Sequence, residues 1–185
     1  MITTADFKNG ISVVIGGILY QLIEFQHIKP GKGGAFVRTR LRNMRTKAVV
    51  DKTFRAGEKI EDAYIETKKM QYTYHSGNTY HFMDSKTFEE VSITESVIGD
   101  NKKFLKEGIE ITSLWHKAQI IDISLPAAII LKITHSEPGI RGDTARQAFK
   151  PATLETGAVV QVPLFVNAGD AIKVDTRTGE YLERA

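Results

Sequence analysis

The first side chain whose setting could support chemistry is Lys32, in the run Pro30-Gly31-Lys32-Gly33-Gly34. Proline stiffens the approach, and the glycines allow a tight turn that leaves the ammonium group unobstructed. A nucleotide-binding P-loop is excluded, because it needs Ser or Thr after the lysine and a helix beyond it. A Schiff-base nucleophile would need burial or a neighbouring cation to lower the lysine pKa. A solvated hairpin tip and a functional lysine both remain open from these residues alone.

The second feature is an alternating run of arginines, Arg38, Arg40 and Arg42, shortly after the loop. Side chains alternate along a strand, so these three share one face and the residues between them share the other. Three like charges on one face repel unless solvent or an anion offsets them, and guanidinium groups pair well with phosphates. Arg45 and Lys47 extend the basic run. The pattern favours an RNA-facing surface, with a solvated outer sheet face as the alternative.

The distribution of charge supports this interpretation. The chain has 185 residues and a net charge of +3, but residues 1–64 hold 11 Lys and Arg against 6 Asp and Glu. The basic surplus therefore belongs to the first third, the part best suited to face phosphates. There is no cysteine, which fits a reducing compartment. No apolar run approaches the ~20 residues of a membrane span, and no secretion signal opens the chain, so we expect a cytoplasmic location.

Other candidate groups point to no specific chemistry. The histidines at positions 27, 75, 81, 116 and 135 are scattered; His75 and His81 flank a predicted turn but have no carboxylate support for a metal site. No Ser-His-Asp order or HExxH pattern is present. The middle of the chain interleaves aromatic residues that either fill a strand core or stack on bases. These aromatic residues are Tyr72, Tyr74, Tyr80, Phe82 and Phe88.

Short strands dominate the predicted elements. Gly16-Gly17 separates predicted strands over 11–15 and 18–23, and Ser76-Gly77-Asn78 is a second hairpin turn. We also predict strands over 65–67, 70–75 and 88–93, and one or two helical turns over 100–106. Loops near residues 64 and 126 divide the chain into 1–64, 65–127 and 128–185. The pattern predicts an all-β protein of three barrel-like modules in series.

Four stretches, taken together and in this order, resemble the bacterial translation elongation factor P family. They are FQHIKPGKGGAF at 25–36, PGIRGDT at 138–144, KPATLETG with VPLFV across 150–166, and VDTRTGEY at 174–181. The resemblance covers essentially the whole chain. It implies an SH3-like N-terminal domain followed by two OB-fold domains in an L shape. It also implies binding to both ribosomal subunits beside peptidyl-tRNA, and rescue of ribosomes stalled at consecutive prolines.

The resemblance also implies roles for individual residues. Lys32 matches the loop position that meets the CCA end of peptidyl-tRNA, and in many members this lysine carries an added β-lysyl or aminopentanol group from a dedicated enzyme. Gly142, Asp143 and Thr144 match a loop associated with the exit-site codon. Tyr181 and Arg184 match terminal positions expected near the small subunit.

The expected protein is therefore a monomeric accessory factor, not an enzyme, with no cofactor beyond the modification of Lys32. Three alternatives stay open at this level. A general single-stranded RNA-binding protein would be indifferent to Lys32. An enzyme would show small-molecule turnover sensitive to Lys32. A paralogue would share these landmarks but relieve stalls at other sequence motifs.

Overall fold

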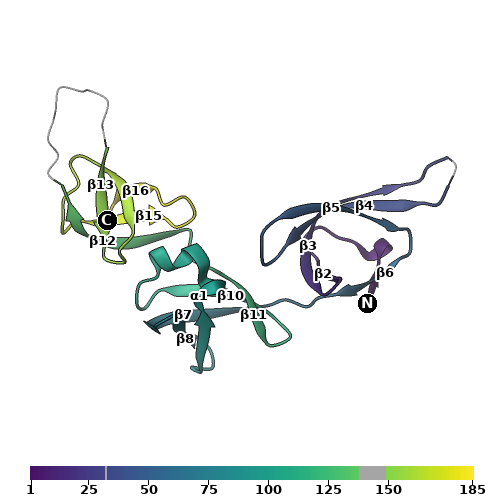
Figure 1. Ribbon diagram of the computed structural model, residues 1–185, viewed down its shortest axis with the longest axis horizontal. Coiled ribbons are helices and arrows are strands. Elements are labelled where there is room, and N and C mark those ends of the chain that lie inside the picture. Colours follow the sequence, from purple (N-terminus) through teal and green to yellow (C-terminus); the bar gives the residue numbers. More distant parts are fainter. Residues whose placement is uncertain (32, 138–148) are drawn as a thin grey trace. The chain divides into compact units, whose positions relative to one another are not determined.

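A computed structural model describes residues 1–31, 33–137 and 149–185. In that part of the chain, strands form three separate antiparallel sheets, and helical structure is confined to short segments (Figure 1). The predicted all-β class is confirmed. No helix in the described residues is both long and apolar enough to cross a membrane.

The first sheet carries the two features that open the sequence argument. Its strands, in order across the sheet, are β1 (Ile2–Thr3), β6 (Lys59–Asp62), β2 (Ser12–Ile15), β3 (Ile18–Ile28), β4 (Phe36–Asn43) and β5 (Val49–Arg55). A short 3-10 segment, η1 (Thr4–Asp6), follows β1. The core beneath the sheet consists of Phe7, Val13, Leu22, Val37, Leu41, Phe54 and Ile60.

The turn between β2 and β3 shows how local sequence sets this sheet. Gly16 and Gly17 have φ of 59° and 78°, and Ile15 pairs with Ile18 across them. A two-residue hairpin needs positive φ at both central positions, which glycine adopts without steric cost. The hairpin predicted from Gly16-Gly17 is therefore confirmed.

The second sheet places the aromatic residues of the middle of the chain. Its strand order is β11 (Gln119–Ser124), β10 (Glu110–His116), β7 (Glu66–Ser76), β8 (Thr79–Asp84) and β9 (Glu90–Thr94). Tyr72 and Phe82 are opposite each other and buried, whereas the side chains of Tyr74 and Phe88 are exposed. The core interpretation therefore holds for two of these aromatic residues, and two others face solvent.

Three predicted boundaries in this part of the chain were wrong. The strands predicted over 65–67 and 70–75 are one long strand, β7, which begins at Glu66 and leaves Ile65 outside it. Phe88 does not begin a strand: its φ of 60° and the bond from its N–H to Asp84 O (2.9 Å) place it in a turn before β9. Helical structure starts earlier than residue 100, as α1 (Glu95–Ile98) followed by the 3-10 segment η2 (Gly99–Phe104).

The third sheet curls so that its two edge strands, β14 and β16, approach each other. Its strand order is β14 (Val159–Pro163), β13 (Phe149–Leu154), β12 (Ala128–Ser136), β15 (Ala171–Asp175) and β16 (Tyr181–Arg184). Alternate residues of β12, Ile129, Leu131 and Ile133, are buried, as expected for a strand with one face in a core.

The described chain divides into two compact units. One contains Met1–Thr67 and Leu114–Asp122, and the other contains Lys68–Ser113 and Ile123–Ala185. The three-domain division at residues 64 and 127 stays a prediction.

Within the second unit, Glu155 joins β12 to the segment that follows η2. Its carboxylate accepts hydrogen bonds from Lys106 Nζ at 2.9 Å and from the backbone N–H of Lys132 at 2.8 Å. Nearby, Thr156 Oγ1 donates to Lys103 O at 2.6 Å. Partial burial raises the pKa of Glu155, but these bonds and the lysine charges outweigh it, so the net pKa lies below its usual 4.5.

This arrangement predicts an acid-sensitive contact. A carboxyl group whose pKa is lowered by folding stabilises the fold above its unfolded pKa, and the contribution is lost as pH falls through the folded pKa. We expect Glu155→Gln to lower the free energy of unfolding at pH 7 by about 1 kcal/mol or less, since the pair is partly exposed. The difference from the parent should shrink below about pH 4. Urea unfolding at pH 7, 5 and 3 measures it, and a difference that grows on acidification would contradict the assignment.

Candidate nucleic-acid interface

The long hairpin of β3 and β4 positions the glycine loop. The register runs from Tyr20 opposite Asn43 to Ile28 opposite Phe36, so the two strands stay paired up to the loop. β5 follows them to the same end, where Arg55 pairs with Phe36 and Ala56 N–H donates to Ala35 O at 2.9 Å. Figure 1 shows this hairpin extending beyond the rest of its sheet. Residues 29–31 and 33–35 thus lie at the end of a hydrogen-bonded pair of strands.

The loop itself consists of exposed residues on both sides of Lys32, which lies outside the described residues. Pro30, Gly31, Gly33 and Gly34 are all exposed. Gly33 has φ of 109°, a backbone conformation that residues with a Cβ rarely adopt. The glycine at position 33 is therefore required by the path of the loop.

The predicted alternation along β4 is present. Arg38, Arg40 and Arg42 are exposed, whereas the intervening side chains are buried. Directly opposed residues of antiparallel strands share a face, so the neighbours of each arginine follow from the register. The charges of those neighbours differ from one arginine to the next.

Arg40 lies between two carboxylates. Glu24 of β3 is opposite it on one side and Asp51 of β5 on the other, with Arg40 Nε 3.8 Å from Asp51 Oδ1. By contrast, Arg38 lies between Gln26 and Thr53, which are neutral. The middle arginine of the row is thus locally neutralised, and Arg38, the one nearest the loop, is not.

Arg55 is a basic residue of this face that the sequence patterns did not single out. It is exposed at the end of β5, two residues beyond Thr53, which pairs with Arg38. Its cross-strand partner Phe36 is uncharged. Residues two apart on a strand share a face, so Arg38 and Arg55 form a diagonal pair of cations at the base of the loop. Only the strand register could have revealed this pairing.

Arg45 and Lys47 lie at the opposite end of β4 from the loop. Arg45 is exposed in the turn after β4, where its N–H donates to Asn43 Oδ1 at 2.9 Å. Lys47 donates to Met44 O at 3.0 Å and forms an ion pair with Asp122. The structure therefore does not bring these two cations to the loop, and the charge of Lys47 is already engaged.

Beneath the arginine face, Thr39 links β4 to the edge strand β5. Its side chain is 1% exposed, and its Oγ1 donates to Lys52 O at 2.8 Å. Valine has nearly the same shape but no hydroxyl. We expect Thr39→Val to lower the free energy of unfolding by about 1 kcal/mol, the usual net value of a buried hydrogen bond. Equilibrium denaturation measures this change, and a variant as stable as the parent would show that the bond contributes nothing.

Of the five residues predicted to contact the exit-site codon or the small subunit, the structure describes two. Gly142, Asp143 and Thr144 lie outside the described residues. Tyr181 begins β16, and the exposed Arg184 ends it, with Arg184 Nη1 4.0 Å from Asp170 Oδ2. Both residues therefore lie on one strand at the edge of the third sheet.

The two histidines at the β7–β8 hairpin have aromatic and polar partners. The rings of Tyr74 and His81 stack with centroids 4.3 Å apart, and His81 Nδ1 lies 2.8 Å from Glu90 Oε1. His75 stacks on Tyr80 at 5.5 Å. Among the described residues, no group of three or more His, Cys, Asp or Glu is arranged to hold a metal ion.

Comparison with known proteins matches the whole chain to one family. Three family models match: the elongation factor P KOW-like domain at residues 3–60, the elongation factor P OB domain at 65–123, and the elongation factor P C-terminal domain at 129–184. Elongation factor P of Natranaerobius thermophilus is 52% identical over 184 residues, covering 100% of this chain and 98% of its own. Elongation factor P of Moorella thermoacetica is 51% identical over 185 residues, covering 100% of both chains.

Solved structures support the same fold at lower identity. Eukaryotic translation initiation factor 5A from Methanococcus jannaschii superposes with a TM-score of 0.55 at 24% identity, covering 67% of this chain and 91% of its own. A related initiation factor from Naegleria fowleri gives a TM-score of 0.56 at 14% identity, covering 67% and 96%. The family models and the full-length relatives agree in every part of the chain, which belongs to the elongation factor P family.

Proposed function

We propose that this elongation factor binds the ribosome beside peptidyl-tRNA and stimulates peptide-bond formation at consecutive prolines. Membership of the elongation factor P family makes it a translation elongation factor and implies association with the ribosome. The contacts and the role of Lys32 are the proposal. The observation that carries it is the β3–β4 hairpin, which presents the glycine loop beyond its sheet with Arg38 and Arg55 at its base.

The physical problem at such a stall is geometric. The proline ring fixes φ and restricts the nascent chain, so a peptidyl-tRNA ending in prolines sits outside the reactive arrangement. Holding the CCA end in place restores the alignment of the ester and the incoming amine. Orientation can lower a barrier by as much as ~7–11 kcal/mol in ideal cases, and a small part of that relieves a stall.

In this proposal Lys32 is a positioning residue. A cationic side chain that donates hydrogen bonds suits the sugar-phosphate backbone of the CCA end. Peptidyl transfer remains the chemistry of the ribosome, so the factor supplies orientation and no base or nucleophile. Arg38 and Arg55 bind phosphates close to the loop and keep it directed at the CCA end.

The C-terminal part of the chain has its own proposed contacts. Tyr181 and Arg184 face the small subunit, and Gly142, Asp143 and Thr144 lie near the exit-site codon. An aromatic ring and a guanidinium group on one edge strand suit stacking and phosphate pairing with RNA.

A covalent group on Lys32 would extend the reach of the loop. Intact-protein mass spectrometry on material purified from its native source shows whether the chain is heavier than its sequence, and fragmentation shows whether the added mass is on Lys32. Protein synthesised in a cell-free system of purified components serves as the control, because no modifying enzyme is present in it.

A reconstituted translation assay tests the function itself. We expect the purified factor to accelerate synthesis of a Pro-Pro-Pro peptide while leaving a Pro-free peptide unchanged. Equal affinity for ribosomes and for free single-stranded oligonucleotides, with no acceleration, would instead identify a general RNA-binding protein. Acceleration at stalls other than proline runs would identify a paralogue with a different motif specificity.

A further inference from the structure

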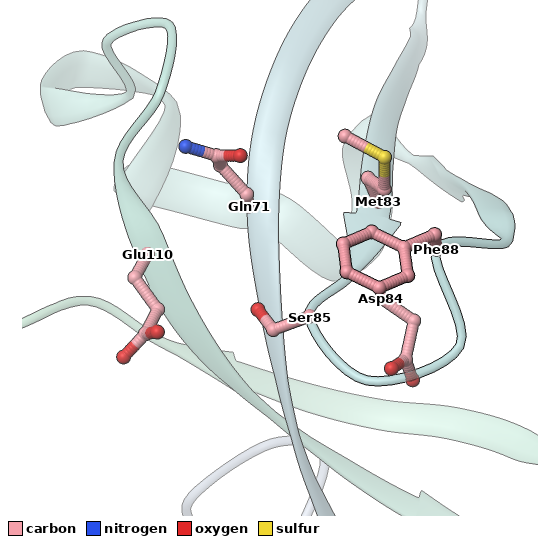
Figure 2. Close-up of a pocket in the computed structure, with 6 residues that line it drawn as sticks. All are labelled: Gln71, Met83, Asp84, Ser85, Phe88 and Glu110. Atoms are coloured by element: carbon pink, nitrogen blue, oxygen red, sulfur yellow. The ribbon is translucent and has the colours of Figure 1, made fainter.

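The middle sheet carries a pocket of about 230 Å³ that the proposed function does not use. It is lined by Gln71, Met83, Asp84, Ser85, Phe88 and Glu110, which come from β7, β8, β10 and the turn after β8 (Figure 2). All six residues belong to the same compact unit. Small-molecule sites usually enclose ~300–1,000 Å³, so this pocket suits a single side chain better than a cofactor.

One wall of the pocket is an aromatic ring held outside the core. Phe88 is 74% exposed and has φ of 60°, a conformation that bulky residues rarely adopt. The turn imposes it: Phe88 N–H donates to Asp84 O, and Asp84 N–H donates to Glu89 O, both at 2.9 Å. Ser85 N–H ties the same turn to Lys69 O at 3.0 Å. An exposed ring in a strained, well-supported position is a reason to look for a ligand.

The polar atoms around the ring are mainly hydrogen-bond acceptors. The Gln71 amide donates from Nε2 to Gly108 O at 3.0 Å, and Figure 2 shows its oxygen on the side of Met83 and Phe88. Asp84 accepts from the N–H groups of Lys86 (2.7 Å) and Thr87 (3.0 Å), which lower the pKa of its carboxyl group and keep it ionised. A second carboxylate comes from Glu110 of β10.

The pocket already attracts one cation at its edge. Lys69 Nζ lies 2.8 Å from Glu110 Oε1, and both side chains are more than half exposed. Exposed pairs of this kind are weak, so another cation can share or replace the lysine. Lys68 and Lys86 also act on Asp84 and lower its pKa, so a phosphate would meet these lysines as well as the two carboxylates, and a nucleotide is therefore included among the probes.

We propose that this pocket, the Phe88 pocket, binds an arginine side chain presented by a segment of a partner protein. A guanidinium group has five donors and no acceptor, which complements the acceptors of the lining. Its plane stacks on an aromatic ring and its fork pairs with a carboxylate, so Phe88 and Glu110 can both contact it. The aliphatic stem packs against Met83. A protein partner fits better than RNA, because the flanking phosphates of a nucleotide would lie near Asp84 and Glu110.

The site can be tested on the full-length ¹⁵N-labelled protein with three probes. They are the peptide acetyl-Gly-Arg-Gly-amide, its citrulline analogue, which keeps the shape but not the charge, and adenosine 5′-monophosphate. We expect saturable amide shifts at Gln71, Ser85 and Phe88 with the arginine peptide, and binding about tenfold weaker with citrulline. No saturable shift, equal binding of citrulline, or tighter binding of the nucleotide would overturn the proposal.

Substitutions separate a binding role from a structural one. Phe88→Gly removes the ring and relieves the positive φ, so the melting temperature should be equal or higher, while affinity for the arginine peptide falls about two- to fivefold. Glu110→Gln keeps the shape and should weaken binding at least as much. Phe165→Ala is the control, since it removes another exposed ring of the same unit, 63% exposed, outside the pocket. Unchanged affinity in both pocket variants, or an equal loss in the control, would refute the site.

Discussion

A Lys32→Ala variant is expected to lose most of its stimulation of Pro-Pro-Pro synthesis while it keeps its fold and its binding to ribosomes. The described residues on either side of Lys32 are exposed, so we expect the substitution to leave the core of the sheet unchanged. We expect the variant to be slower in peptide-bond formation, the step for which the CCA end must be held in place. We expect a reduction of about tenfold or more in the rate of the stalled step, which corresponds to ~1.4 kcal/mol. Single-round synthesis with purified ribosomes measures it.

The matched control for this experiment is Lys29→Ala. Lys29 is an exposed lysine three residues earlier in the same loop, so this variant makes the same change in net charge and in side-chain size. A positional role for Lys32 predicts that Lys29→Ala retains most of the stimulation. If the Lys32 variant restored synthesis as well as the parent, or if both variants failed equally, the specific role of Lys32 would be wrong.

The second large effect is expected from the cation pair at the base of the loop. Replacement of both Arg38 and Arg55 by alanine should weaken ribosome binding and flatten its dependence on salt. Each phosphate contact contributes roughly 0.7–0.9 to the slope of log K against log salt concentration. Loss of two contacts therefore lowers the slope by about 1.5, and the affinity in low salt falls by more than tenfold. Binding titrations at several salt concentrations measure both quantities.

Arg40→Ala is the internal control, on the same strand and the same face. Glu24 and Asp51 flank Arg40, so its charge is largely offset in the free protein. We expect it to change the slope by less than half as much as Arg38→Ala. A slope that drops equally for the two single variants would show that the whole arginine row acts as one surface and that the flanking acids are irrelevant.

Local patterns accounted for much of the first sheet. The alternation along β4 identified which side chains face solvent, because successive residues of a strand point to opposite faces whatever their partners are. The Gly16-Gly17 turn was equally local, since few residues other than glycine tolerate its positive φ values. In both cases a few adjacent residues are enough to predict the local structure.

Features that depend on distant partners were missed or misplaced. Phe88 was assigned to a strand over 88–93, but hydrogen bonds within residues 84–89 hold it in a turn, and the bond from Ser85 N–H to Lys69 O joins that turn to β7. The Phe88 pocket was not predicted, because its lining comes from residues between 71 and 110 that only the folded sheet brings together. Periodicity reports which face a residue takes, and it carries no information about which strand lies beside it.

The sequence by itself determined the all-β class, the family, and a lysine in a glycine-rich loop followed by an arginine row. Motif residues and strand alternation are properties of neighbouring positions, so they can be recognised without coordinates. The tertiary structure alone decided which of those arginines is available. The pairing of β3, β4 and β5 places acids beside Arg40, neutral residues beside Arg38, and Arg55 diagonally next to it. Electrostatic interactions depend on distance in space, and strand register sets that distance.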